Sequence, residues 1–148
     1  MFKYTSGNMY VQYIDAPAPS THMKLEEVQT LKNEWAHFSL GPTYSAHDVE
    51  QELMNELYKT FPPNIFNAYL YQCIGPSLPI HKDIARDTCF NYILNTGGDN
   101  VETVWYDDNY KEIHREYIEP NRWHQLKVDV LHTVEGITNK RYGITVNE

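Results

Sequence analysis

Cysteine is scarce in this sequence, whose 148 residues include only Cys73 and Cys89. Both stand within apolar, strand-like runs, and the sequence has no CxxC spacing. A disulfide framework or a zinc knuckle needs more cysteines at closer spacing. We therefore expect Cys73 and Cys89 to be buried, reduced thiols.

Long apolar runs are also absent. A membrane-spanning helix needs roughly 18 or more consecutive apolar residues, and no stretch approaches that length. The first residues, MFKYTSGNMYVQYID, show no basic segment followed by an apolar one. Neither a signal peptide nor a membrane span is predicted, and we expect a cytoplasmic protein.

Positively charged residues are few. The sequence has 12 Lys and Arg residues but 20 Asp and Glu residues, which gives a formal net charge of −8. Such a field repels phosphate backbones, so we expect no nucleic-acid partner. What is abundant is tyrosine, with 12 residues among 14% aromatics. Aromatic side chains pack well on pleated sheets, which favours a sheet-rich fold.

The length of the chain predicts a single domain spanning 1–148. Its first part, 1–63, is expected to hold a strand at Met9–Ile14 and two helices. One helix is predicted over Ser45–Phe61, because Ser45 suits an N-cap and apolar residues recur at helical spacing. A weaker helical pattern covers Lys24–Phe38.

From Asn64 onward the pattern changes to short alternating segments separated by turn residues. The predicted strands are Ile65–Ile74, Leu78–Lys82, Thr88–Asn95, Val101–Tyr106, Glu112–Ile118, Trp123–Asp129, Val130–Glu135 and Arg141–Val146. Eight antiparallel strands without intervening helices fit a jelly roll. The expected fold is mainly β, a cupin-like double-stranded β-helix over 64–148 that forms the catalytic core and is covered by the N-terminal helices.

A candidate metal site begins at the tripeptide His-Lys-Asp. Residues two apart in an extended chain point to the same side, so His81 and Asp83 could reach one ion together. Such pairs also arise by chance in a chain with 7 histidines, and a third ligand is needed.

His132 supplies that third ligand, with His124 on a neighbouring strand as its rival. Two histidines and one carboxylate on one ion leave adjacent coordination positions open, which is typical of non-haem Fe(II) oxygenases. Arg141 follows nine residues after His132 and opens the last predicted strand. An arginine facing into a barrel is costly unless it meets a carboxylate, which it can hold with two hydrogen bonds.

The chain resembles the 2-oxoglutarate and Fe(II)-dependent oxygenases. The resemblance rests on HKD at His81–Asp83, LHTV around His132 and RYGITV from Arg141, and it covers Asn64 to Val146. Within that superfamily the chain looks most like small, often phage-encoded members related to prolyl and aspartyl/asparaginyl hydroxylases. For a phage protein, the cytoplasm would be that of the host.

The resemblance implies an enzyme that uses Fe(II), O2 and 2-oxoglutarate, and that couples decarboxylation of 2-oxoglutarate to succinate with hydroxylation of a C–H bond. His81, Asp83 and His132 would bind the iron, and Arg141 would bind the distal carboxylate of 2-oxoglutarate. Many relatives carry a serine two residues after that arginine, where this chain has Gly143. Thr145 or a tyrosine is expected to supply the hydrogen bond to the cosubstrate that this serine makes in relatives.

Several further residues are candidates for the pocket. Tyr69 and Tyr71 alternate on the strand before His81, and either one could contact the cosubstrate or simply belong to a tyrosine-rich sheet face. Asn91 is a candidate polar pocket residue. Arg86 and Arg122 are local positive charges near the predicted site, although Arg86 could equally be a surface partner of an acidic residue.

We expect the substrate to be an amino-acid-like small molecule or a residue in a polypeptide, because isolated arginines suit compact carboxylates better than an extended backbone. Two other functions remain open at this stage. One is a cupin-like binding module without oxygenase activity, and the other is a structural jelly-roll protein of a virion. The oligomeric state is not determined by the sequence.

Overall fold

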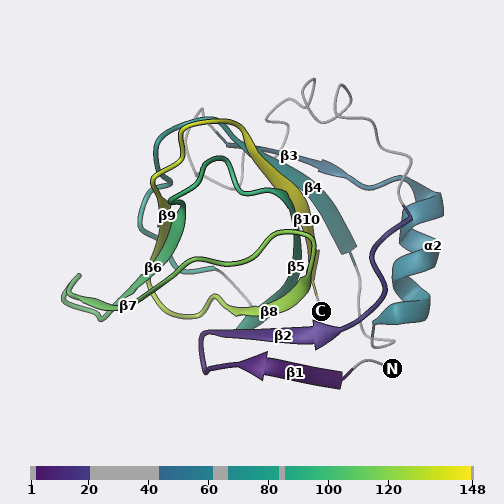
Figure 1. The fold of residues 1–148 in the computed structure, drawn as a ribbon, viewed down its shortest axis with the longest axis horizontal. Coiled ribbons are helices and arrows are strands. Elements are labelled where there is room, and N and C mark those ends of the chain that lie inside the picture. The colour runs from purple at the N-terminus through teal and green to yellow at the C-terminus, as the bar shows by residue number, and fades with distance from the viewer. Residues whose placement is uncertain (1–2, 21–43, 62–66, 84–85, 148) are drawn as a thin grey trace.

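Two antiparallel β-sheets form most of the part of the chain that the computed structural model describes, residues 3–20, 44–61, 67–83 and 86–147. The seven-stranded major sheet has the order β1 (Lys3–Gly7), β2 (Val11–Asp15), β8 (Trp123–Lys127), β5 (Thr88–Asn95), β10 (Arg141–Asn147), β4 (Asn67–Cys73) and β3 (Tyr44–Asp48). The three-stranded minor sheet has the order β7 (Glu112–Glu116), β6 (Glu102–Tyr106) and β9 (His132–Glu135). The two sheets face each other (Figure 1).

The chain passes repeatedly from one sheet to the other. It leaves the major sheet after β4, returns in β5, enters the minor sheet in β6 and β7, and then alternates through β8, β9 and β10. Between β4 and β5, two isolated bridges join the chain to the minor sheet, Ser77 with Glu135 and His81 with His132. Residues far apart in the sequence therefore meet in the space between the sheets.

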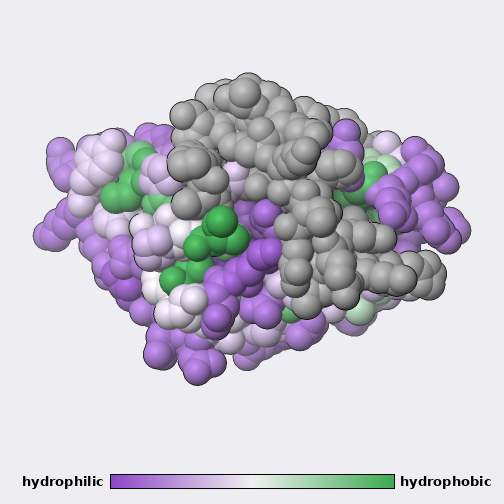
Figure 2. All heavy atoms as spheres, turned by 90° about the horizontal axis from the view of Figure 1, so that it is seen from above, coloured by the Kyte–Doolittle hydropathy of each residue, from purple (hydrophilic) through white to green (hydrophobic). Residues whose placement is uncertain are grey.

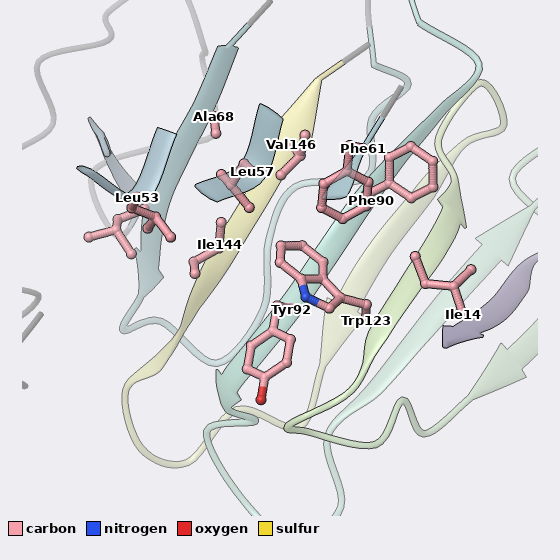
Figure 3. Packing of buried hydrophobic residues seen from close by; sticks show 11 residues of the cluster. Ile14, Leu53, Leu57, Phe61, Ala68, Phe90, Tyr92, Trp123, Ile144 and Val146 are labelled. Atoms are coloured by element: carbon pink, nitrogen blue, oxygen red, sulfur yellow. The ribbon is translucent and has the colours of Figure 1, made fainter. Parts of the chain in front are cut away.

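The central strands of the major sheet are buried on both faces, for different reasons. On its outer face, Ile144 and Val146 of β10 pack against Leu57 and other apolar residues of helix α2 (Gln51–Thr60), as Figure 3 shows. The alternate residues of β10 point the other way because side chains alternate along a strand. That inner face carries Arg141 and Thr145, which line a pocket.

Helix α2 is shorter than predicted. The expectation of a helix over Ser45–Phe61 with Ser45 as its cap is wrong at its start, because Tyr44–Asp48 forms strand β3 and Glu50 occupies the N-cap position without a side-chain cap. Pairing of β3 with β4 overrides the local helical signal. The other predicted helix, Lys24–Phe38, lies outside the described residues.

The strand predictions agree best with the structure from Thr88 onward. Thr88–Asn95 is β5 with the predicted bounds, and the predicted strands from Val101 onward correspond to β6 through β10 with small shifts at their ends. The segment Leu78–Lys82 is not a continuous strand, since only isolated bridges link its neighbourhood to β9. Pro79 lacks the N–H group that a continuous ladder would need there. Strands β1 and β3 were not predicted.

On the face that Figure 2 shows, hydrophilic residues predominate and hydrophobic ones form small groups between them. None of the described helices is both long and apolar enough to cross a membrane.

Candidate metal centre and pocket

Paired backbone hydrogen bonds place the two predicted histidine ligands side by side. The N–H of His81 donates to the carbonyl of His132 at 3.0 Å, and the N–H of His132 donates to the carbonyl of His81 at 2.9 Å. Residues paired in this way project their side chains to the same face, and the two ring centroids are 4.5 Å apart. Asp83, two residues further on, is fixed by its own N–H, which donates to the Val128 carbonyl at 2.9 Å.

The three side chains converge on one point. The Oδ1 atom of Asp83 lies 3.4 Å from Nε2 of His81 and 3.4 Å from Nε2 of His132. One candidate ligand atom from each residue lies within 4.8 Å of the other two, which is close enough for the three to hold one metal ion. Of the described residues, only these three form such a group.

The orientation of the imidazoles also favours a cation. Nδ1 of His81 bonds to the Pro79 carbonyl at 2.7 Å, and Nδ1 of His132 bonds to the Val130 carbonyl at 2.6 Å. Because a carbonyl only accepts, each Nδ1 carries a proton, which leaves Nε2 of each ring facing Asp83. Lone pairs and a carboxylate repel one another unless a proton or a metal cation lies between them. Backbone carbonyls holding Nδ1 are a common support for metal-bound histidines.

The Asp83 carboxyl group is held in its ionised form. Burial would raise its pKa, but hydrogen bonding with the His132 and His81 rings and the charge of Arg86 outweigh burial and hold the pKa well below its usual range. The side chains of His81, Asp83 and His132 are 22%, 14% and 7% exposed. The site is thus reachable from outside but shielded from most solvent.

A pocket of about 540 Å³ lies between the sheets and includes the three ligands. It is large enough for a small organic molecule. The predicted residues that line it together with the ligands are Arg141, Tyr71, Tyr69, Asn91, Thr145 and Arg86. The structure therefore brings these predicted residues into one pocket.

Arg122 does not line this pocket. Its guanidinium bonds to Glu119 at 2.7 Å and lies 4.0 Å from the centre of the Tyr13 ring. Arg86 does line the pocket, but its partner is the Asp83 carboxylate rather than a surface acid. Neither arginine is left as a free positive charge for a substrate.

Arg141 is buried, with 7% of its surface exposed, at the end of β10 next to Cys73 of β4. One of its terminal nitrogens donates to the Thr96 carbonyl at 3.0 Å. The Tyr71 hydroxyl lies close by. Burial raises the pKa of Tyr71, and the Arg141 charge opposes that rise.

Gly143 lies where the backbone leaves no room for a side chain. It is paired with Tyr71, and a Cβ atom at this position would lie 2.9 Å from the Tyr71 hydroxyl and 2.5 Å from the Tyr92 carbonyl. A serine would therefore clash with the backbone of β5. The Tyr71 hydroxyl occupies the space beside Gly143.

A row of polar side chains crosses the inner face of the major sheet. Tyr69 of β4, Thr145 of β10, Asn91 of β5 and His124 of β8 stand at adjoining register positions. All four line the pocket. The sheet thus presents hydrogen-bonding groups to a ligand where most protein cores are apolar.

Some pocket residues were missed by the sequence reasoning. Asn147 lies two residues after Thr145 on the same strand, so the two-residue alternation of a strand could have placed it on the pocket face. Cys89 was expected to be buried, which is confirmed, but its place on the pocket wall was not foreseen. Tyr44 had no usable signal, because the residues after it resemble a helix and not a strand.

His124 is not part of the metal cluster, although it lines the same pocket. It is 1% exposed, and burial together with the Arg141 charge lowers its pKa from 6.5 to about 3. The ring is therefore neutral near pH 7. Its place in the middle of the sheet makes it a wall residue and leaves His132 as the partner of His81 and Asp83.

The buried His124 predicts a pH dependence of stability. In the unfolded chain its pKa returns to 6.5, so between about pH 6.5 and pH 3 the unfolded state binds the extra proton. The free energy of unfolding should then fall as the pH falls, by up to about 1.4 kcal/mol per pH unit. His124→Gln should reduce that slope in urea denaturation of metal-free protein. A slope equal to that of the wild type would contradict the assignment.

Comparison with known proteins does not supply a family for this chain. No protein-family model matches it, and no curated protein matches it significantly. The site is therefore interpreted from its own geometry.

Proposed function

We propose that this protein is an Fe(II)- and 2-oxoglutarate-dependent oxygenase, and more specifically a hydroxylase. The observation that carries the proposal is the shared pocket of the His81–Asp83–His132 cluster and the buried Arg141. A cation site and a buried guanidinium within one pocket suit a ligand that binds a metal at one end and carries a carboxylate at the other.

The strand order supports a double-stranded β-helix as the finer description of the fold. From β4 to β10, the chain alternates between a sheet ordered β8-β5-β10-β4 and a second layer ordered β7-β6-β9, which the bridges of Ser77 and His81 extend. Two facing sheets built by such alternation enclose a pocket at their centre. Strands β1, β2 and β3 would then be additions at the edges of the major sheet.

The donor set fits Fe(II). Two imidazole nitrogens and one carboxylate oxygen are the ligands of the facial triad, which leaves three positions for cosubstrate and oxygen. Bound iron would supply the oxidation chemistry that no side chain can perform. The protein's own part is to orient the imidazoles through their Nδ1 bonds to the Pro79 and Val130 carbonyls, so that Nε2 of each ring faces the metal position.

Arg141 would hold the distal carboxylate of 2-oxoglutarate. Only one of its donors is used by the Thr96 carbonyl, and charge-assisted bonds from a guanidinium are strongest in a buried setting. Tyr71, rather than Tyr69, is the better second donor because its hydroxyl lies beside Arg141. Thr145 and Asn91 belong to the polar row and would contact the middle of the ligand.

The substrate we propose is an amino-acid-like molecule or a residue in a polypeptide. The chain carries a formal net charge of −8, which opposes binding of a phosphate backbone. Succinate formation should be stimulated by members of panels of free amino acids, peptides or protein extract. Stimulation by oligonucleotides alone, with a steep salt dependence, would contradict this substrate class but not the metal site.

The direct test of the proposed function is spectroscopic. Anaerobic addition of Fe(II) and 2-oxoglutarate to the purified protein should produce a visible charge-transfer band, because the cosubstrate would chelate the iron. His132→Ala should abolish the band, since it removes one of three ligands. His114→Ala, which removes an imidazole from β7 outside the pocket lining, is the control and should retain it. The absence of a band from folded wild-type protein would contradict the proposed function.

Arg141→Met should weaken 2-oxoglutarate binding while leaving iron binding nearly intact. Loss of a buried charged partner typically costs about 2–5 kcal/mol, which corresponds to roughly 30-fold to several thousandfold in Kd. Titration of the visible band with 2-oxoglutarate measures this change. Arg115→Met, which removes a guanidinium from the minor sheet, should leave the Kd unchanged. An unaltered Kd in Arg141→Met would remove the argument for 2-oxoglutarate.

A further inference from the structure

Arg86 has a contact that the proposed function does not require. Its Nε donates to Oδ2 of Asp83 at 2.7 Å, and a terminal nitrogen donates to the same oxygen. The side chains of Arg86 and Asp83 are 22% and 14% exposed, so this is an ion pair largely withdrawn from water. Two donors of one guanidinium on one oxygen fix the rotation of the carboxylate.

The two oxygens of Asp83 therefore have separate partners. Oδ1 is the atom that lies 3.4 Å from Nε2 of both histidines, whereas Oδ2 receives the guanidinium. A cation that bound both oxygens would have to approach Oδ2, where the positive charge of Arg86 already lies. We propose that Arg86 is a positioning residue that restricts Asp83 to metal binding through Oδ1 alone. This inference rests on the proposed metal site.

The restriction has a chemical consequence for the open coordination positions. Two imidazoles and one carboxylate oxygen leave three positions on a six-coordinate ion. A cosubstrate that chelates through two atoms would need two of them, and oxygen would need the third. If Asp83 bound through both oxygens, one of these positions would be lost. Arg86 thus keeps the position for oxygen available without touching the metal.

The same restriction selects among metal ions. Ca²⁺ accepts carboxylates through both oxygens and takes up to eight ligands, whereas smaller ions with octahedral geometry do not need the second oxygen. With Oδ2 occupied by Arg86, the site disfavours Ca²⁺. Removing Arg86 from Oδ2 should therefore increase the affinity of the site for Ca²⁺ relative to smaller ions.

The test uses Mn²⁺ as a magnetic probe in the full chain without cosubstrate. Electron–nuclear double resonance in isotopically enriched water counts the water molecules bound to Mn²⁺. Arg86→Met should show one bound water fewer than the wild type, because Asp83 can then bind through both oxygens. Arg86→Gln carries the same expectation if Arg86→Met does not fold. The control is Arg115→Met, which removes an arginine that pairs with Glu112 three residues earlier on the minor sheet, and its water count should equal that of the wild type.

Competition between Ca²⁺ and Mn²⁺ provides a second readout. Removing the guanidinium takes away one positive charge, which affects both divalent ions alike, so the ratio of their Kd values cancels this effect. Changes next to a ligand typically alter metal affinity about 10–100-fold, and we expect the Ca²⁺ to Mn²⁺ ratio to fall about tenfold in Arg86→Met. A merely structural ion pair would leave the ratio unchanged.

The outcomes separate this inference from the proposed function. Failure of folded wild-type protein to bind Mn²⁺ at the cluster would overturn the metal site and with it the role of Arg86. Mn²⁺ binding by the wild type, combined with unchanged water count and Kd ratio in the Arg86 variants, would overturn only the positioning role.

Discussion

The pair of backbone hydrogen bonds between His81 and His132 is the contact on which the rest of the site depends. It joins the segment after β4 to the first residue of β9, across 51 positions of the chain. Further contacts secure the same junction, including the Thr133 hydroxyl, which donates to the Leu78 carbonyl. Without this junction, the two imidazoles would not share a face, and Asp83 would have no fixed relation to either. A single pair of backbone hydrogen bonds thus brings together groups that lie far apart in the sequence.

A second constraint is that the two faces of the major sheet have opposite chemical character. Its outer face is apolar and packs on α2, whereas its inner face carries buried polar groups that line the pocket. Buried polar groups cost free energy unless they are satisfied by partners or by a ligand. Arg141 is partly satisfied by the Thr96 carbonyl, and Arg86 by Asp83. The difference between these two arginines decides their proposed roles, since Arg86 forms an ion pair with Asp83, whereas Arg141 donates to a neutral backbone carbonyl.

Much of the β core could be predicted from the sequence, because a regular alternation of apolar and polar residues indicates a strand. The bounds of β5 agree with the predicted Thr88–Asn95, and those of β10 differ from the prediction by one residue. The prediction failed where tertiary pairing overrode local pattern, as in Tyr44–Asp48, which carries a helical signal but pairs with β4. It also failed at Leu78–Lys82, where Pro79 interrupts the ladder and leaves isolated bridges. Local propensity is too weak to decide such cases against a neighbouring strand.

For the candidate site, the sequence determined the chemical types and their order along the chain. Spacing and residue chemistry pointed to His81 and Asp83, because ligand atoms two apart on an extended segment must share a side. The preference for His132 over His124 rested on the distance to Arg141 in the family that the sequence resembles. The tertiary structure decided which atoms meet. It assigned Arg86 to Oδ2 of Asp83, placed Tyr71 rather than Tyr69 beside Arg141, and put His124 in the pocket wall. These relations depend on strand register and sheet order, which are set by contacts between distant segments that no short stretch of sequence encodes.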